Sequence, residues 1–527
     1  MSAPAPLSSP APLSAAAASS AGAAQSGEID AARRTFITVS VMLASIMSAL
    51  DTTIANVALP RIQGSISATQ DQITWVLTSY IVAAAIMTPL SGWLAGRIGR
   101  KKVFLYSVAG FTVASMLCGA AQSLPQIVLA RLIQGLCGAA LIPLSQAVLL
   151  DINPPARHAR AMAVWVMGAT LGPIIGPALG GWLTEDYNWR WVFYINVPFG
   201  ILAFFGIVSF LPEGATRKSR FDFFGFAALS VAIAALQVML DRGQLKDWFS
   251  SEEIWIEAIV SAVAFYWFVI HMLTTTERRF VSPALFKDRN FLAGNVIIFV
   301  VGAVLYATLA LLPPLLQDLL NYPVVTTGLV TAPRGAGTLA AMFIVGRLMG
   351  KIDVRLIIGT GFGLAAVSSW QMTGFDVQMD SAMVVWSGIL QGLGTGFVYV
   401  PLAAATFATL TPALRNEGTA IFSLTRNLGS SIGISVVNTL LTRNTQIMHA
   451  TLSEHVSRYS PVLRAQMPDA APSLRALAGL NATVTEQAAM IAYNNDFKLM
   501  MLLSLAAIPL VCLLRKAKGS APPVSIE

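Results

Sequence analysis

Charged residues, cysteine and histidine are scarce in this chain of 527 residues. Only 11% of the residues are charged and 55% are hydrophobic, whereas about a quarter of a soluble domain is charged. The three cysteines have no metal or redox spacing, which argues against a disulfide framework or a metal centre. The chain has only four histidines, which argues against a catalytic cluster. It has no GxxxxGK[ST] pattern, which argues against an ATP site. We therefore expect no enzyme activity, no metal and no cofactor.

Long apolar segments dominate what the chain does contain. A helix needs about 20 apolar residues to cross a bilayer. Fourteen segments approach that length, which predicts an all-α membrane protein with 14 transmembrane helices. Their approximate ranges are 36–58, 73–95, 103–122, 126–150, 162–183, 191–211, 223–240, 254–273, 291–312, 325–347, 355–372, 381–406, 417–441 and 498–514.

The basic residues predict the orientation of these spans. An even number of spans places both termini on one side, and most of the 34 Lys and Arg fall in loops and tails of that side. Cytoplasmic loops carry this excess, so both termini are expected in the cytoplasm. Residues 1–32 lack the basic start of a signal peptide and are expected to form a disordered cytoplasmic tail, and residues 519–527 are expected to form a second cytoplasmic tail. The net charge of +8 is then an orientation signal rather than a sign of nucleic acid binding.

One apolar segment carries a ladder of glycines four residues apart. Because a helix repeats every 3.6 residues, such a ladder leaves one helix face without side chains. We expect this bare face to slide or seal against the opposite half of the bundle and to act as a gate. Its residues are Gly168, Gly172, Gly176, Gly180 and Gly181, with Pro173 and Pro177 beside them.

Two patterns recur along the chain. The glycine and basic residues that follow the second span, Gly92, Arg97, Gly99 and Arg100, return in similar form from Gly346 to Arg355. The tripeptide Gln-Gly-Leu occurs in the fourth span and again in the twelfth. Both repeats are eight spans apart, which predicts two six-helix halves, 33–214 and 281–518, with two inserted helices at 215–280. Residues 442–497 are expected to form a long outer loop in the second half.

Several fragments resemble the fourteen-span drug:proton antiporter family of the major facilitator superfamily, and two resemble its EmrB-type multidrug exporters. The family-level fragments are LDTTIANVALP from Leu50, RLIQGLCGAALIPL from Arg131, GATLGPIIGPALGG from Gly168, WRWVFYINVPFG from Trp189 and GTAIFSLTRNLGSSIG from Gly418. The exporter-level fragments are LDRGQLKDWFSSEEI from Leu240 and LFKDRNF from Leu285. Gly96 stands where this family usually has an acid.

The resemblance implies a major facilitator fold and proton-driven export of drugs across the inner membrane of a bacterium. It also implies two partners, a periplasmic adaptor (EmrA-like) that could meet the long outer loop and an outer membrane channel (TolC-like). An exporter of one endogenous metabolite or siderophore on the same scaffold is the alternative.

Ionisable residues deep in the spans are candidates for proton coupling, because they are costly in lipid. Asp51 and Arg131 lie at matching depths, roughly 8 to 11 Å below the outer surface at 1.5 Å per residue. We expect Asp51 to take up and release the proton while Arg131 stabilises its charged form. A permanent structural ion pair is the alternative.

The substrate site is expected between the halves, near the middle of the membrane. One deep acid and three deep arginines disfavour dicationic drugs and favour lipophilic neutral or weakly acidic compounds. The polar and aromatic residues that could contact them are Asn56, Gln72, Trp75, Tyr80, Gln134, Asn295, Tyr306, Arg334, Gln391, Tyr399, Arg426 and Asn438. The loop containing Gly92, Arg97, Gly99 and Arg100 is either a topology determinant or a cytoplasmic gate.

Overall fold

The computed structural model describes residues 30–154, 157–213, 216, 221–275, 279–411, 414–456 and 474–515. Most of the expected N-terminal tail and all of the C-terminal tail lie outside these residues. Every element of three or more residues in the described ranges is helical. The fold is therefore all-α.

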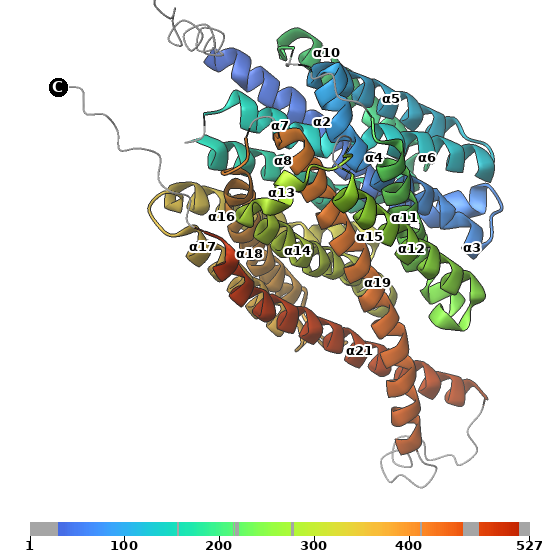
Figure 1. The fold of residues 1–527 in the computed structure, drawn as a ribbon. Coiled ribbons are helices and arrows are strands. Elements are labelled where there is room, and N and C mark those ends of the chain that lie inside the picture. The colour runs from blue at the N-terminus through green and yellow to red at the C-terminus, as the bar shows by residue number, and fades with distance from the viewer. Residues whose placement is uncertain are drawn as a thin grey trace, which may run out of the picture.

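The first half consists of the helices up to residue 210 (Figure 1). Two of the predicted spans are each built from two consecutive helices, α6 with α7 and α9 with α10. The bounds are α2 Ala31–Ser65, α3 Gln70–Ile73, α4 Trp75–Ile98, α5 Arg100–Ala120, α6 Leu124–Gly138, α7 Leu141–Ile152, α8 His158–Asp186, α9 Trp191–Tyr194 and α10 Asn196–Phe210.

The second half follows two further long helices, α11 Phe223–Arg242 and α12 Glu252–Thr274, which are joined by short helical turns. It contains one π-helical segment, η4, directly after two prolines. The bounds are α13 Pro283–Lys287, α14 Arg289–Pro314, η4 Leu315–Leu319, α15 Val324–Thr331, α16 Pro333–Leu348, α17 Val354–Met372, α18 Ser381–Phe407, α19 Arg415–His455, α21 Leu474–Leu510 and η5 Val511–Leu513.

The two halves pack their helices in the same pattern. In the first half α2 packs along α8, and α6 packs against α4 and α5. In the second half α14 packs along α19, and α18 packs against α16 and α17. Helix α8 also contacts α15, α16 and α18, and α19 contacts α4 and α7, so these two helices form much of the boundary between the halves.

The inserted helix α11 bridges that boundary. It packs against α4 of the first half and α19 of the second. The Thr78 hydroxyl of α4 donates to the Asp241 carboxylate, and the Ser435 hydroxyl of α19 donates to the Leu240 carbonyl at 2.9 Å. Helix α12 packs mainly on α11 and exposes a row of large apolar side chains, including Trp255, Ile259 and Phe265.

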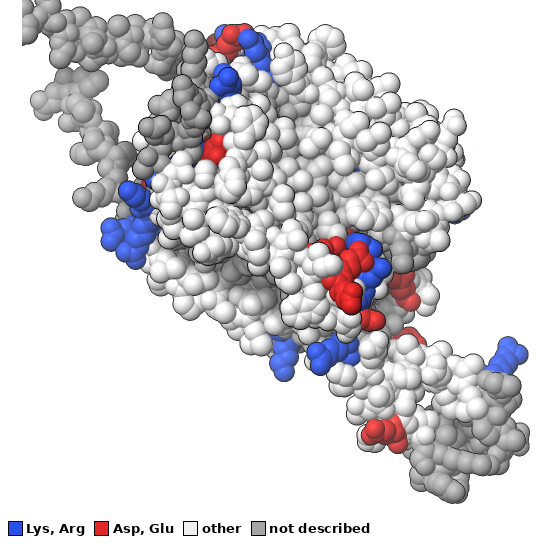
Figure 2. Space-filling model, turned by 45° about the vertical axis from the view of Figure 1, so that its right-hand side comes forward, with Lys and Arg blue, Asp and Glu red and all other residues white. Residues whose placement is uncertain are grey.

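Eleven of the described helical segments are long and apolar enough to cross a membrane. The other three predicted spans are covered by α8, α17 and α19, which are helices of 29, 19 and 41 residues outside that set. The number of fourteen crossings therefore remains a prediction. The surface in Figure 2 agrees with a membrane protein, because broad areas of it carry no charged residue and the charges gather in a few places.

Both described ends of the chain lie on one face, which we call the terminal face. There the Arg33 side chain at the start of α2 donates to the Phe210 carbonyl at 2.9 Å, and the Asn290 side chain donates to the Arg515 carbonyl at 3.1 Å. The turns after α4 and α16 each contain a glycine with positive φ, Gly99 at 95° and Gly350 at 87°. These values are open to glycine at little cost, which explains why glycine recurs at both turns.

The expected loop over 442–497 is largely helical. Helix α19 continues to His455 and α21 begins at Leu474, while residues 457–473 lie outside the described part. The two helices pack together and project beyond the rest of the bundle as an orange and red pair (Figure 1). His449 and Asn481 join them through a hydrogen bond of 3.1 Å. The sequence did not reveal this pair, because its polar composition places it outside the apolar spans.

Candidate functional site

The Asp51 carboxylate of α2 lies against the Arg131 guanidinium of α6. The Arg131 Nη1 donates to Asp51 Oδ2 at 2.6 Å, and the side chains of Arg131 and Asp51 are 1% and 0% exposed. Arg131 also donates from Nε to the Val76 carbonyl at 3.0 Å, so its position is fixed from a second helix. The structure thus places side by side the two residues that were predicted to lie at the same depth in their spans.

Two amides complete the hydrogen bonds of the carboxylate. Gln134 Nε2 and Asn196 Nδ2 each donate to Asp51 Oδ1 at 2.8 Å. Asn196 is held in turn by its bond to the Ser115 hydroxyl at 2.9 Å. Gln134, predicted as a substrate contact, thus binds the carboxylate instead. Asn196 was not among the predicted residues, although an asparagine at the start of an apolar helix is a signal that could have identified it.

Tyr80 separates this buried pair from a large cavity. The Arg131 guanidinium lies 4.3 Å from the centroid of the Tyr80 ring, a cation–π distance. Tyr80 also lines the cavity, whereas Asp51 and Arg131 do not. Any rearrangement of the cavity wall that moves Tyr80 therefore changes the surroundings of the ion pair.

The cavity lies between the two halves and has a volume of about 820 Å³. Its walls come from α2, α4, α7, α8, α14, α16 and α19, and α11 contributes Gln237. Most lining atoms are apolar, and three exposed charged residues line it on the face opposite the termini, Arg61, Glu185 and Asp318. A cavity of this size and character suits a drug-sized apolar compound.

Five of the predicted substrate contacts line this cavity, and these are Asn56, Tyr80, Tyr306, Arg334 and Arg426. The remaining candidates lie elsewhere. Five of them have contacts within one helix or between helices: Gln72 caps α3, Trp75 lies beside Arg242, Gln134 binds Asp51, Asn295 donates to the Phe291 carbonyl, and Tyr399 accepts from Arg426. Gln391 is buried outside the cavity, and Asn438 is exposed.

The two buried arginines that line the cavity, Arg334 and Arg426, differ in their hydrogen bonds. Arg426 donates to the Tyr399 hydroxyl at 3.1 Å and to Asn427 Oδ1 at 3.1 Å. Arg334 is 7% exposed, and neither Nη1 nor Nη2 has a hydrogen-bond partner within the described part of the chain. Arg334 therefore brings two donors without a protein acceptor to the wall of the cavity.

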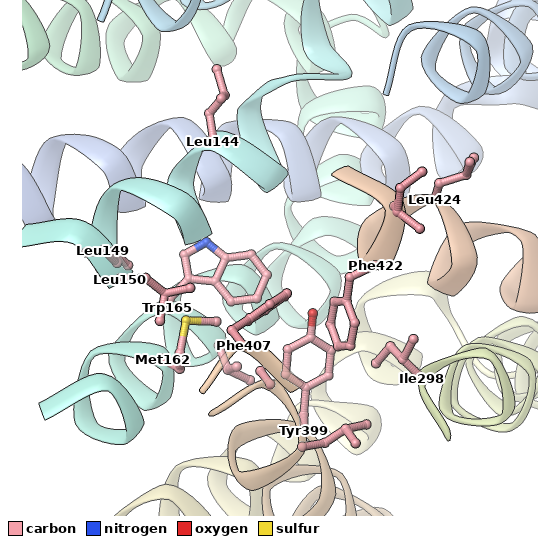
Figure 3. Close-up of a cluster of buried hydrophobic side chains, with 14 of the residues drawn as sticks. Leu144, Leu149, Leu150, Met162, Trp165, Ile298, Tyr399, Phe407, Phe422 and Leu424 are labelled. Carbon is pink, nitrogen blue, oxygen red and sulfur yellow. The ribbon is translucent and has the colours of Figure 1, made fainter. Parts of the chain in front are cut away.

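An aromatic layer lies between the halves, and Trp165, which belongs to it, also lines the cavity. Figure 3 shows the rings of this layer. The Trp165 ring of α8 stacks on the Tyr399 ring of α18 with centroids 6.0 Å apart, and Phe422 and Phe407 continue the layer. The Tyr399 hydroxyl accepts from Gln146 Nε2 of α7 at 3.2 Å. We call this layer the aromatic closure.

Polar contacts lie nearer the terminal face. Asp151 of α7 pairs with Arg100 of its own half and with Arg415 of the other half, the latter at 3.0 Å. A Cβ atom at Gly92 would lie 3.0 Å from the Asn416 carbonyl oxygen, so α4 and α19 meet there with no room for a side chain. Of the predicted gate-loop residues, Gly92 and Arg100 therefore take part in contacts at the boundary. Gly99 forms the turn after α4, and the Arg97 guanidinium lies 5.3 Å from the centroid of the Trp93 ring.

Comparison with known families decides what kind of protein this is. A Major Facilitator Superfamily profile matches residues 41–434, and the multidrug export protein EmrB of Escherichia coli K12 is 38% identical over 440 residues, 83% of this chain and 86% of that protein. This chain belongs to the major facilitator superfamily. The fatty acid resistance protein FarB of Neisseria gonorrhoeae is 37% identical over 491 residues, 92% of this chain and 97% of its own.

Solved structures of the superfamily share the fold. The human organic anion transporter MFSD10 matches with a TM-score of 0.57 at 15% identity, covering 89% of this chain and 99% of its own. A bacterial homologue of the lysosomal transporter Spinster, in an inward-facing and unoccupied conformation, matches with a TM-score of 0.54 at 15% identity, covering 92% and 99%. At these identities the likeness concerns the fold alone.

The glycine ladder of this major facilitator protein faces α2, not the opposite half. Gly172 packs on Ala49 and Leu50, Gly176 on Thr53 and Gly180 on Ile54. The expectation of a bare face sealing against the second half was therefore wrong, because the spacing defines a stripe but not the direction in which the stripe points. Two residues predicted together with the ladder, Pro177 and Gly181, line the cavity instead. Elsewhere on α8, Trp165 and Ala169 also line it, and Ala178 packs on Gly328 of the second half.

Proposed function

We propose that this protein is a proton-driven multidrug efflux transporter that exports lipophilic neutral or weakly acidic compounds. The observation that carries the proposal is the buried Asp51–Arg131 pair, which is screened by Tyr80 from a drug-sized cavity between the halves. The EmrB proteins at 38% and 36% identity support the same function.

Proton binding at Asp51 is the proposed coupling step. The ionised carboxylate is stabilised by the Arg131 cation and by two amide donors. Protonation removes the charge and weakens the bond to Arg131, which frees the guanidinium and its neighbour Tyr80 to move. In the reverse direction, a compound that binds in the cavity displaces the Tyr80 ring. The Asp51–Arg131 ion pair then forms again, and Asp51 releases its proton.

The proton gradient supplies enough free energy for this work. One elementary charge crossing about 100 mV yields about 2.3 kcal/mol, and about 1.4 kcal/mol corresponds to a tenfold concentration ratio. A single proton therefore sustains a gradient of roughly fifty-fold without any cofactor.

The cavity chemistry supports the substrate preference. Its walls are mainly apolar, and Arg334 holds two unpartnered nitrogens among the described residues. A weakly acidic compound that enters as its anion gains a charge-assisted hydrogen bond there, whereas a dication meets two arginines, Arg334 and Arg426.

The proposed setting is the bacterial inner membrane, with both termini and the terminal face in the cytoplasm. The excess of basic residues in the loops of that side supports this orientation. The cavity is then closed on the cytoplasmic side and reaches the outer side, an outward-facing arrangement. The projecting pair of α19 and α21 lies on the outer side and is the proposed contact for an EmrA-like adaptor that leads to a TolC-like channel.

Efflux measured in cells with a panel of compounds tests this function. We expect accumulation of lipophilic weak acids to fall when the protein is expressed, and this effect to vanish when an ionophore that is not a weak acid collapses the proton gradient. Asp51→Asn should abolish the effect at unchanged expression. Drug-driven proton release from Asp51→Asn vesicles at the wild-type rate would remove Asp51 from the mechanism, and a preference for dications would overturn the substrate class.

A further inference from the structure

A second buried carboxylate lies on α21 in the other half of the molecule. Asp496 is 1% exposed, and neither of its oxygens has a hydrogen-bond partner among the described residues. None of the ion pairs in the described ranges includes it. Asp51, which is buried to the same extent, accepts hydrogen bonds from three side chains.

The surroundings of Asp496 are apolar. Its neighbour Phe497 packs in a cluster with Met490, Tyr493 and Met500 of α21, and the same cluster contains Leu315 and Leu316 of η4. The titratable neighbour is Tyr493 on α21, whose hydroxyl lies within electrostatic range of Asp496 and also of Asp318 on η4. Arg443 of α19 and Lys498 of α21 are exposed.

An ionised carboxylate without donors in such a place is costly, because nothing replaces the water it has lost. A neutral carboxyl group avoids most of that cost. We propose that Asp496 is a second proton-binding site, which holds a proton while α21 packs against η4 and releases it when this contact opens. The proton comes from water at the outer face and returns to water there, so the side chain alternates between a neutral carboxyl and a carboxylate.

The packing of η4 connects this site to the cavity. Gln317 and Asp318 of η4 line the cavity, whereas Leu315 and Leu316 of the same segment belong to the cluster beside Asp496. Short π-helical segments occur often at functional sites, and this one follows Pro313 and Pro314. Deprotonation of Asp496 would draw water into the cluster and loosen η4, which changes the cavity mouth on the outer side.

Infrared spectroscopy of the purified full-length protein tests the proposal without requiring transport, so its outcome is independent of Asp51 as the coupling residue. The difference spectrum between acidic and alkaline samples should contain the carbonyl stretch of a protonated carboxyl group buried in an apolar site. We expect Asp496→Asn to remove that band and Asp51→Asn to retain it. Glu486→Gln, on the same helix and outside the cluster, is the matched control and should also retain it. A band that persists unchanged in Asp496→Asn would overturn the proposal.

Thermal unfolding gives a second readout. A group that binds its proton more tightly in the folded state loses stabilisation as the pH rises. The unfolding temperature of the wild type should therefore fall more steeply between mildly acidic and neutral pH than that of Asp496→Asn. Asp496→Leu, which needs no proton, should show the same flattened dependence and covers the case in which Asp496→Asn folds poorly. Equal slopes in the wild type and in a folded variant would contradict a proton at this site.

Discussion

The Trp165 indole and the Tyr399 phenol stack across the boundary between the two halves, with ring centroids 6.0 Å apart. Each ring is also held by a hydrogen bond, Trp165 Nε1 to the Ser45 hydroxyl at 3.1 Å and Gln146 Nε2 to the Tyr399 hydroxyl at 3.2 Å. The aromatic closure therefore joins three helices of the first half to α18 of the second. It must separate whenever the cavity opens to the terminal face.

Tyr399→Phe should weaken the closure while keeping the ring. The change removes the hydroxyl that accepts from both Gln146 and Arg426, and an unsatisfied buried donor costs about 1–3 kcal/mol. We expect the population open to the terminal face to rise by roughly five- to a hundred-fold. Spin-label distances between the terminal-face ends of α4 and α19 should report the shift. Tyr106→Phe, which alters a ring that is 68% exposed, should leave the distances unchanged. Identical distributions for Tyr399→Phe and the wild type would refute the gating role.

A reversible cross-link between residues 151 and 415 should lock the protein in the closed arrangement. Arg415 Nη1 lies 3.0 Å from Asp151 Oδ1 across the boundary, so cysteines at both positions come within reach of a short bifunctional methanethiosulfonate reagent only while the terminal face is closed. In a background without Cys118, Cys137 and Cys512, the reagent should stop transport and a reductant should restore it. Each single cysteine variant serves as the control. Undiminished transport by the cross-linked protein would show that these helices need not part.

Gly172→Ala should disturb the coupling site. A Cβ atom there would lie 2.6 Å from the Leu50 amide nitrogen and 2.7 Å from the Ala49 carbonyl carbon, directly before Asp51. Overpacking of this kind costs about 1–3 kcal/mol. We expect a lower unfolding temperature and impaired proton-coupled efflux. Gly96→Ala is the matched control, because nothing lies within 4 Å of a Cβ at that helical position. Wild-type coupling in Gly172→Ala would mean that α2 adjusts freely.

Arg334→Gln should reduce the affinity for anionic compounds more than for neutral ones. A hydrogen bond to a charged group contributes about 1.5–3 kcal/mol, which corresponds to a loss of roughly ten- to a hundred-fold. Binding of a lipophilic carboxylate and of its methyl ester to the purified protein measures the difference. Arg347→Gln, on the exposed side of the same helix, should change neither affinity. An equal loss for acid and ester would assign Arg334 a structural role.

The sequence predicted positions along helices better than directions around them. Asp51 and Arg131 could be paired because residue counts give depth, and depth alone brought them to the same level. The orientation of the glycine stripe could not be obtained in this way. It depends on the rotation of α8 about its axis, which packing against α2 determines.

Two residues near helix ends, Asp496 and Asn196, were not predicted from the sequence. The run from Tyr493 to Asp496 is polar, so the last span was expected to begin after it and Asp496 was assigned to a loop. Asn196 could have been identified as a polar residue in an apolar span, but its partner Asp51 lies in another span 145 residues away. A single sequence does not indicate which residues so far apart are in contact.

The glycine stripe brings the backbones of α2 and α8 into direct contact at the level of Asp51. Long side chains between two helices bend and change rotamer, and so they absorb small displacements. Bare backbones have no such compliance. When α8 shifts during a rearrangement at the boundary between the halves, α2 therefore moves with it. The distance between the Asp51 carboxylate and Arg131 then changes. The stripe makes this part of the protein stiff where stiffness is useful, between the moving boundary and the group that binds the proton.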